Sequence, residues 1–404
     1  MRIARVIQVA IVVAGLVISS NCLADLVIHV LDVGQGDCTL IISPTGGTFL
    51  FDAGWNGMGN DVVCPYLDAL GLTALDYIGC SHYHADHIGG IDEVIYYLGI
   101  DSIRVAVLDR GWSYTTATYD DYAAAAAPKR QTIVDGQVID LGGGVTITCV
   151  AVNGNGQLSP PYDDQYNEND LCVALLVEYG DFDFFVAGDL SGVNSSYYHD
   201  IETSVAAEVG DIDIYRVDHH GSASNSNVNL VSTLLPEVSI ISVGDNSYGH
   251  PTQTVIDRLI SYGSYIYQTE LGSGGTIPSG YGEVVNGHIV IRVTSTQYTV
   301  NGDAYALGNS GITATPVYEP LSIYPNPFSS AVSFDFGSVS TNNAEVAIYS
   351  VEGRLIKLMR FDSGVSHRLM WDGTTQGGGQ VSPGVYIVRF SDGDHAVSRK
   401  IVRR

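Results

Sequence analysis

Cys80-Ser81-His82-Tyr83-His84-Ala85-Asp86-His87-Ile88-Gly89-Gly90 places three imidazoles and one carboxylate within six residues. A strand-like apolar run precedes this stretch, and a helix-like run follows the two glycines. On a loop between a strand and a helix, the spacing can direct His82 and His84 at one point, and Asp86 and His87 at a second point nearby. Imidazole and carboxylate groups are common ligands of Zn²⁺, Mn²⁺ and Fe. The sequence therefore predicts a metal site here.

The chain is long enough for two domains, and its charge is unevenly distributed. It has 404 residues, 45% of them hydrophobic, and a formal net charge of −26. Residues 25–320 hold seven Lys/Arg and 37 Asp/Glu, whereas residues 321–404 hold nine Lys/Arg and seven Asp/Glu. A first domain of charge −30 repels polyanions and offers no basic surface for nucleic acid. Tight DNA binding is therefore not expected.

Residues 1–24 have the features of a secretory signal peptide. Two arginines precede an apolar run, residues 6–18, that is too short to span a bilayer comfortably. Cys22-Leu23-Ala24 is a plausible cleavage site, and a lipoprotein anchored through Cys22 is the alternative. No later segment is long and apolar enough to be transmembrane, so we expect a secreted or cell-surface protein. Cleavage leaves five cysteines, which favours buried thiols, or one disulfide with free thiols, over a disulfide framework.

Short strand-like runs with glycine turns open the first domain and suggest an antiparallel sheet at the start of an α/β sandwich. A later segment, residues 109–130, interrupts this pattern with interleaved aromatic residues and five consecutive alanines. It can either overhang the metal cleft as a lid or pack as an ordinary insertion. A helix-like stretch is expected at residues 194–209.

The stretch at residues 80–90 resembles the signature of the metallo-β-lactamase-fold hydrolases. Leu31-Asp32-Val33-Gly34-Gln35-Gly36-Asp37 is similar to the entry strand of one branch, which contains the ComEC-type competence proteins and the bacterial phosphorylcholine esterases. The resemblance covers roughly residues 26–300. It implies a four-layer αββα sandwich for residues 25–300 and two bound ions, with Zn²⁺ expected and Mn²⁺ as the alternative.

The resemblance also implies which residues bind metal. Asp189, which ends a strand-like run, matches the family's bridging aspartate, and His219-His220-Gly221-Ser222 matches the branch's last metal motif. We expect His219 to complete the site of Asp86 and His87, with His220 in an outer position or in the cleft. The expected metal ligands are His82, His84, Asp86, His87, Asp189 and His219. Asp52 matches a motif that generally supports the metal loop through hydrogen bonds.

One family histidine is missing between the first cluster and Asp189. Asn167-Glu168-Asn169-Asp170 occupies its place, so the site built on His82 and His84 lacks its third imidazole. Asp170 or Asn169 can substitute directly or through water, which would shift the preference toward Mn²⁺. One full site and one weak site is the alternative.

The last part of the chain has the pattern of a small β-sandwich. Residues 301–320 are expected to be a linker, and residues 321–404 show alternating strands separated by glycine turns. Tyr324-Pro325-Asn326-Pro327-Phe328, Trp371-Asp372-Gly373 and Ser382-Pro383-Gly384-Val385-Tyr386 resemble the C-terminal sorting domain of type IX secretion cargo. The implied partner is the type IX secretion machinery. An ordinary adhesion or carbohydrate-binding sandwich is the alternative.

These observations predict a secreted, metal-dependent phosphodiesterase that acts on nucleic acid or on a small phosphodiester through a metal-activated hydroxide. Asp86 is expected to orient the hydroxide as well as bind metal. His250, in the branch-like segment Tyr248-Gly249-His250-Pro251, is expected to donate a proton to the leaving group or to hold a substrate oxygen. The alternatives are an acyl hydrolase of the lactonase or β-lactamase kind, and a non-catalytic surface-binding protein with a degenerate metal site.

Overall fold

The computed structural model describes residues 25–163, 165–307, 322–324, 328–335, 344–350, 354–361, 368–391 and 396–404. The expected signal peptide, residues 1–24, and most of the expected linker lie outside the described residues. Within them, no helix is long and apolar enough to cross a membrane.

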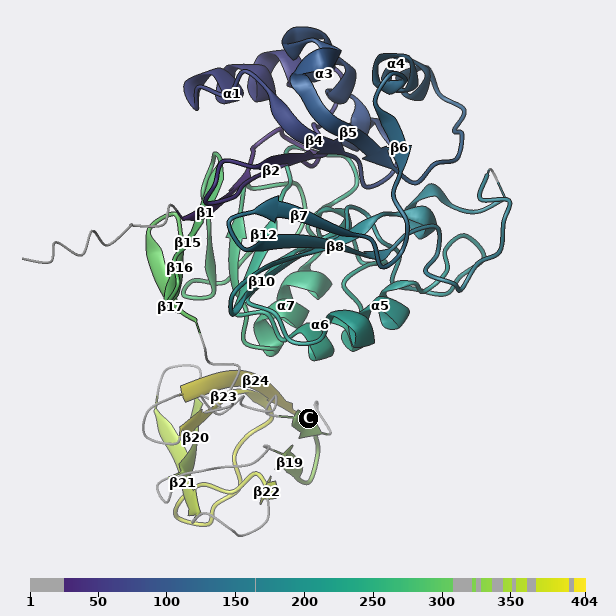
Figure 1. The fold of residues 1–404 in the computed structure, drawn as a ribbon. Helices are drawn as coiled ribbons and strands as arrows, with labels where there is room; N and C mark the ends of the chain where they lie inside the picture. Colours follow the sequence, from purple (N-terminus) through teal and green to yellow (C-terminus); the bar gives the residue numbers. More distant parts are fainter. Residues whose placement is uncertain are drawn as a thin grey trace, which may run out of the picture.

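The first sheet has nine strands, antiparallel from β17 to β3 and parallel from β3 to β6. In spatial order they are β17 (Asp303–Ala306), β16 (Gln297–Val300), β15 (Ile289–Val293), β1 (Leu26–Val30), β2 (Thr39–Ile42), β3 (Thr48–Phe51), β4 (Leu75–Gly79), β5 (Ile103–Asp109) and β6 (Arg130–Thr132). Its outer face is covered by helices that come from the connections between the parallel strands (Figure 1). They are η1 (Gly59–Val63), α1 (Cys64–Ala69), α3 (Ile91–Leu98), η2 (Ile100–Ser102) and α4 (Ala117–Ala126).

The second sheet has eight strands, antiparallel from β7 to β10 and parallel from β10 to β14. In spatial order they are β14 (Gly282–Val284), β13 (Tyr265–Gln268), β12 (Val238–Ile241), β11 (Ile214–Arg216), β10 (Phe182–Val186), β9 (Ala174–Tyr179), β8 (Val145–Ala151) and β7 (Val138–Gly142). Its outer face carries α5 (Glu202–Val209), α6 (Val228–Leu234) and α7 (Gln253–Ser261), on the side away from the first sheet (Figure 1).

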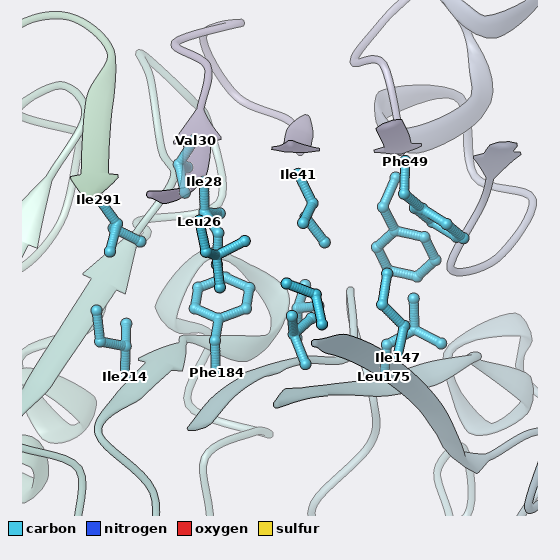
Figure 2. Packing of buried hydrophobic residues seen from close by; sticks show 14 of the residues in the cluster. Leu26, Ile28, Val30, Ile41, Phe49, Ile147, Leu175, Phe184, Ile214 and Ile291 are labelled. Carbon is cyan, nitrogen blue, oxygen red and sulfur yellow. The ribbon is translucent and has the colours of Figure 1, made fainter. Parts of the chain in front are cut away.

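Successive side chains along the strands point to opposite faces of each sheet, and together with the helices they form three hydrophobic cores. In β1, Leu26, Ile28 and Val30 all join the core between the two sheets, where they meet Phe184 and Ile214 of the second sheet (Figure 2). The next residue of β10, Phe185, joins the opposite core beneath the helices of the second sheet. A third core lies between the first sheet and its helices. The domain is therefore the expected αββα sandwich.

Two expectations about local structure were wrong, and the structure decides a third point that the sequence left open. Only α5, from Glu202 onward, is helical in the stretch 194–209. β17 pairs with β16 as the edge of the first sheet, so the expected linker of residues 301–320 begins too early. The insertion at residues 109–130 contains α4, between β5 and β6, and it packs Tyr119 and Tyr122 into the core under α4 as an ordinary insertion does. These two rings thus serve packing.

The C-terminal region forms two small sheets. One contains β18 (Ser322–Tyr324), β19 (Val332–Asp335) and β22 (Arg368–Trp371), and the other β21 (Leu355–Phe361), β20 (Ala344–Ser350), β23 (Gly384–Ser391) and β24 (Ala396–Arg403). Their shared core is centred on Trp371, whose Nε1 donates a hydrogen bond to the Thr374 carbonyl oxygen at 2.8 Å. This is the expected small β-sandwich. The five cysteines in the described residues are free and buried.

Candidate metal centre

The candidate ligands come from three loops that follow strand ends. His82 and His84 lie between β4 and α2 (Ala85–Ile88), and Asp86 and His87 lie in α2 itself. Asp189 follows β10. His219 and His220 lie in η4 (Asp218–Gly221), which follows β11. β4, β10 and β11 belong to the parallel parts of the two sheets, so their carboxyl ends bring the three loops together.

Asp52 holds the first of these loops. Its Oδ1 accepts a hydrogen bond from the Ser81 N–H at 2.7 Å, and its Oδ2 accepts one from the Ser81 hydroxyl at 2.8 Å. The same Oδ2 lies 2.9 Å from Nδ1 of His87. A carboxylate can only accept, so Nδ1 of His87 carries the proton and Nε2 presents its lone pair to the centre. Asp52 thus acts on the ligands and lies outside the cluster.

Ser81, which hydrogen-bonds to Asp52, fixes the tautomer of His82 in the same way. Because the Ser81 hydroxyl donates to Asp52, its oxygen accepts from Nδ1 of His82 at 3.0 Å. Nε2 of His82 is then unprotonated, and it lies 2.9 Å from Nδ1 of His84 and 3.8 Å from Oδ2 of Asp189. These nitrogens and one oxygen of Asp189 form the first half of the centre.

His219 adds a third imidazole to that half. Its Nδ1 lies 2.9 Å from Oδ1 of Asn225, and the Asn225 amide is oriented because its Nδ2 donates to the Asp189 carbonyl oxygen at 3.0 Å. Nε2 of His219 therefore points its lone pair at Oδ2 of Asp189, 3.3 Å away. His219 and His82 thus face the same carboxylate oxygen.

His220 completes the second half. Its Nδ1 lies 3.0 Å from the Ser242 carbonyl oxygen, and its Nε2 lies 3.4 Å from Oδ2 of Asp86. Nε2 of His87 faces the same region, 3.2 Å from Oδ1 of Asp189. The structure therefore places His220 beside Asp86 and His87, where His219 was expected. Both histidines have left-handed backbone angles, with φ of 52° and 53°, which send consecutive side chains to different sides of Asp189.

The donor set fits divalent cations. Lone pairs of His87, His219 and His220 each face a carboxylate oxygen at 3.2 to 3.4 Å, with no proton left to bridge them while the rings are neutral. Nε2 of His87, Nε2 of His220 and Oδ1 of Asp189 are buried and lack a hydrogen-bond partner. A buried acceptor facing another acceptor is costly unless a cation lies between them. The residues present can therefore hold a metal in each half.

The field at the centre favours positive charge. Burial lowers the pKa of His220, but the carboxylates of Asp37 and Asp189 outweigh that effect and raise it to about 10. Burial likewise raises the pKa of Asp189, but the neighbouring histidines, His219 first, bring it well below its usual value. In the metal-free chain, protons on imidazoles meet this demand, and bound cations would displace them.

Two further residues lie directly behind the second half. Oδ1 of Asp37 lies 3.2 Å from Nδ1 of His220 and accepts a hydrogen bond from Nη2 of Arg216. Both residues are almost completely buried. Asp37 belongs to the Gly-Gln-Gly-Asp phrase at residues 34–37, which signalled the branch but gave no role for the carboxylate.

Asp170 binds a histidine that lies outside the proposed ligand set. Oδ2 of Asp170 lies 2.7 Å from Nδ1 of His199, and Oδ1 accepts from the His199 N–H. Both oxygens of Asp170 therefore hold the loop before α5, which differs from the expectation that Asp170 substitutes for the missing ligand. Its neighbour Asn169 does reach the centre, where Nδ2 donates to Oδ2 of Asp189 at 3.4 Å.

His250 lies at the edge of the centre, on the loop before α7. Its ring centroid is 5.4 Å from that of His219 and 6.5 Å from that of His220. Its Nδ1 is buried without a hydrogen-bond partner. Burial, together with the nearby histidines, lowers the pKa of His250 to about 4, so the ring is neutral at pH 7.

Double variants test which histidine belongs to which half. We expect His219→Ala and His220→Ala each to weaken the retention of one ion at least about 100-fold, since outer contacts of a ligand alone are worth 10- to 100-fold. Adding His84→Ala to His219→Ala removes a second ligand from the same half, so about one ion per chain should remain. Adding His84→Ala to His220→Ala damages both halves, and little metal should remain. Metal content after dialysis gives the answer, and the reverse pattern would place His219 with Asp86 and His87.

Comparisons with known proteins match two families to two parts of the chain. Residues 31–157 match the family model of the metallo-beta-lactamase superfamily, and residues 322–404 match that of the secretion system C-terminal sorting domain. The chain is 26% identical over 271 residues to ComE operon protein 3 of Bacillus subtilis, which covers 63% of this chain and 33% of that protein. It is 28% identical over 248 residues to Recombination protein 2 of Haemophilus influenzae, covering 60% of this chain and 27% of that protein.

The chain thus spans about a third of the length of these curated relatives. Among solved structures, the metallo-beta-lactamase fold protein YhfI from Bacillus subtilis is 15% identical, with a TM-score of 0.38, and covers 67% of this chain and 100% of its own. A C-terminal sorting domain of this kind indicates a secreted or cell-surface protein. These matches give the chain a metallo-beta-lactamase superfamily domain at residues 31–157 and a secretion sorting domain at residues 322–404, and the first domain is similar to competence and recombination proteins.

Proposed function

We propose that the chain is an exported, metal-dependent phosphodiesterase that acts on a small or short substrate. The observation that carries this proposal is the position of Asp189, whose two carboxylate oxygens face two different sets of imidazoles. Sites that hold two ions around a shared ligand suit in-line displacement, because they act on both the attacking and the leaving oxygen. The relatedness to competence and recombination proteins also favours a phosphodiester as the substrate.

Divalent cations at this centre would supply Lewis acidity, which lowers the pKa of water and offsets negative charge on phosphorus. Zn²⁺ is our first choice, because the donors are five imidazole nitrogens and carboxylate oxygens of the kind that Zn²⁺ binds; Mn²⁺ is the alternative. The proposed ligands are His82, His84, His219 and Asp189 in one half, and Asp86, His87, His220 and Asp189 in the other.

Two residues of the chain would act on the reacting groups. Asp86 is the most exposed carboxylate of the cluster, so it can orient the attacking water as well as bind metal. Neutral His250 would hold a substrate oxygen through a ring N–H, which fits its unpaired Nδ1 better than donation from an imidazolium. Outside the centre, Asp52 and Ser81 would keep the ligand loop in place.

Charge limits the size of the substrate. Arg110, Arg130 and Arg216 each bind a carboxylate of the protein, on Glu168, Asp109 and Asp37. Residues 25–320 carry a net charge of −30, so a long polyanion finds little to attract it. A substrate with a single diester phosphate needs no further cation once the centre is loaded.

The test is turnover by the full chain, stripped of metal and reloaded with Zn²⁺ or Mn²⁺. The substrates are bis-p-nitrophenyl phosphate, p-nitrophenyl phosphorylcholine, single-stranded DNA, a lactone and a chromogenic β-lactam. We expect cleavage of phosphodiesters, faster for the small esters than for DNA at physiological salt. Cleavage of only the lactone or the lactam would instead make the protein an acyl hydrolase, and metal binding without turnover would support a surface-binding role.

A further inference from the structure

An aromatic side chain extends outward from the candidate metal centre. The ring of Tyr248 lies 5.7 Å from that of His250, with an angle of 29° between their planes, and His250 in turn lies beside His219 and His220. Tyr248 is nonetheless 66% exposed. One face of a large aromatic ring therefore stands open to solvent next to the site where the reaction would occur.

The loop that carries Tyr248 is held in place by one asparagine. Oδ1 of Asn246 accepts from the backbone N–H groups of Tyr248 at 3.0 Å and His250 at 3.1 Å. Its Nδ2 donates to the carbonyl oxygens of Gly244 and His250, both at 2.9 Å. The backbone on either side of the ring is thus fixed before any ligand arrives, which lowers the entropy cost of binding.

The fold itself gives Tyr248 no other task. Among the described residues its hydroxyl has no hydrogen-bond partner, and it belongs to none of the buried clusters. Tyr119 and Tyr122 differ, because they are buried and their hydroxyls bind Trp112 and Asp109. A fixed, exposed ring beside a reaction centre is what stacking on a planar ligand requires.

We propose that Tyr248 is a specificity-determining residue that stacks on a planar ring of the substrate, so that the preferred diester carries a nucleoside or another aromatic group. The inference rests on the proposed phosphodiesterase function and narrows its substrate class. Because the arginines nearest the centre bind the protein's own carboxylates, ring stacking would supply binding that a basic surface supplies elsewhere. A stacked base is sequence-tolerant, since every base has a flat face.

Ligand binding tests this directly. Thymidine 5′-monophosphate and methyl phosphate carry the same phosphate, but only the first has a ring. Titration calorimetry on the zinc-loaded full chain should show about tenfold tighter binding of the nucleotide. Tyr248→Ala should remove that preference, whereas Tyr248→Phe should retain it, because the ring stays and only the hydroxyl is lost. The matched control is Tyr96→Ala in α3, a tyrosine of equal exposure, which should leave the preference unchanged.

Equal binding of the two phosphates to the native chain, or a preference that survives Tyr248→Ala, would overturn the proposal. Hydrolysis of thymidine 5′-(p-nitrophenyl) phosphate and methyl p-nitrophenyl phosphate is measured on the same preparations. One outcome is that neither ester is cleaved but the nucleotide binds more tightly than methyl phosphate and loses this advantage in Tyr248→Ala. The phosphodiesterase function then fails, and the stacking role of Tyr248 stands. If both esters are cleaved equally well and the two phosphates bind equally tightly, the stacking role of Tyr248 fails and the phosphodiesterase function stands.

Discussion

Replacing Asp189 with alanine is expected to damage both halves of the metal centre at once. Oδ1 of Asp189 lies 3.2 Å from Nε2 of His87, and Oδ2 lies 3.3 Å from Nε2 of His219. No other described carboxylate reaches both sets of imidazoles, so nothing can take its place. We expect metal content to fall from about two ions per chain to one or fewer. Turnover should fall at least about 10³-fold, a factor that marks the upper end of the range for removing a single preorganised catalytic group.

Asp170→Asn is the matched control for this variant. Asp170 is also a buried carboxylate near the centre, but its oxygens bind His199 and not the imidazoles of the cluster. The Asp170→Asn variant should keep its metal content and the larger part of its turnover. Metal content by mass spectrometry and turnover on bis-p-nitrophenyl phosphate are measured together, with circular dichroism to check the fold. Full activity in Asp189→Ala, or loss of metal in Asp170→Asn, would contradict the assignment of the centre.

The fold and the metal loop could be predicted from the sequence because their signals are local. The stretch at residues 80–90 carries its ligands within six residues, and alternating apolar residues mark the strands that present them. Asp189 follows a buried strand, β10, and its proposed role rests on that position together with the resemblance. Each of these signals depends only on neighbours in the sequence.

The roles of His219 and His220 could not be read in this way. Which of two consecutive histidines faces which half depends on backbone angles, and both residues adopt a left-handed conformation that is rare for histidine. The sequence also could not show which residue stands where the third imidazole is missing. We propose that His219 does, and it lies some fifty positions later in the chain. Asn225 orients that side chain, and nothing in its local sequence marks it.

The aromatic insertion at residues 109–130 shows a different limit. Its composition suits either a binding lid or a packed helix, and the choice depends on which surface is nearby. In the structure, Arg130 and Tyr122 both bind the buried carboxylate of Asp109, and the ring of Tyr119 packs against Tyr83 of the metal loop. The insertion therefore supports the metal loop from behind. Tyr248 also stands open beside the centre, and composition did not mark it.

Asp37→Ala should lower the free energy of unfolding of the metal-free chain more than the other substitutions do. Asp37 and Arg216 are 3% and 1% exposed, and the arginine donates to Oδ1 of the aspartate and, at 2.8 Å, to the Val217 carbonyl oxygen. Asp37→Ala leaves the guanidinium buried without its counter-charge. Breaking such a buried pair from one side typically costs about 3–5 kcal/mol, so the midpoint of urea unfolding should fall clearly in the metal-free chain.

Asp37 also acts on the second half of the metal centre, and a second variant separates the two roles. The double variant Asp37→Ala with Arg216→Met removes the stranded charge, so most of the lost stability should return, as buried pairs are often replaceable by apolar groups of similar volume. The contact of 3.2 Å between Asp37 and Nδ1 of His220 stays lost. Retention of the ion bound by Asp86, His87 and His220 should therefore remain about 10- to 100-fold weaker in both variants, the range for losing an outer contact of a ligand.

Urea unfolding of the metal-free variants and metal retention of the folded ones measure the two effects independently. Equal stability of Asp37→Ala and the native chain would show that the ion pair is not needed for the fold. Recovery of metal retention in the double variant would show that Asp37 acts only through Arg216. We expect neither, because His220 has two acceptors at Nδ1, the Ser242 carbonyl and Asp37, and only Asp37 is charged. A carboxylate behind a ligating imidazole makes the ring a stronger base toward the metal, and a carbonyl alone cannot match that.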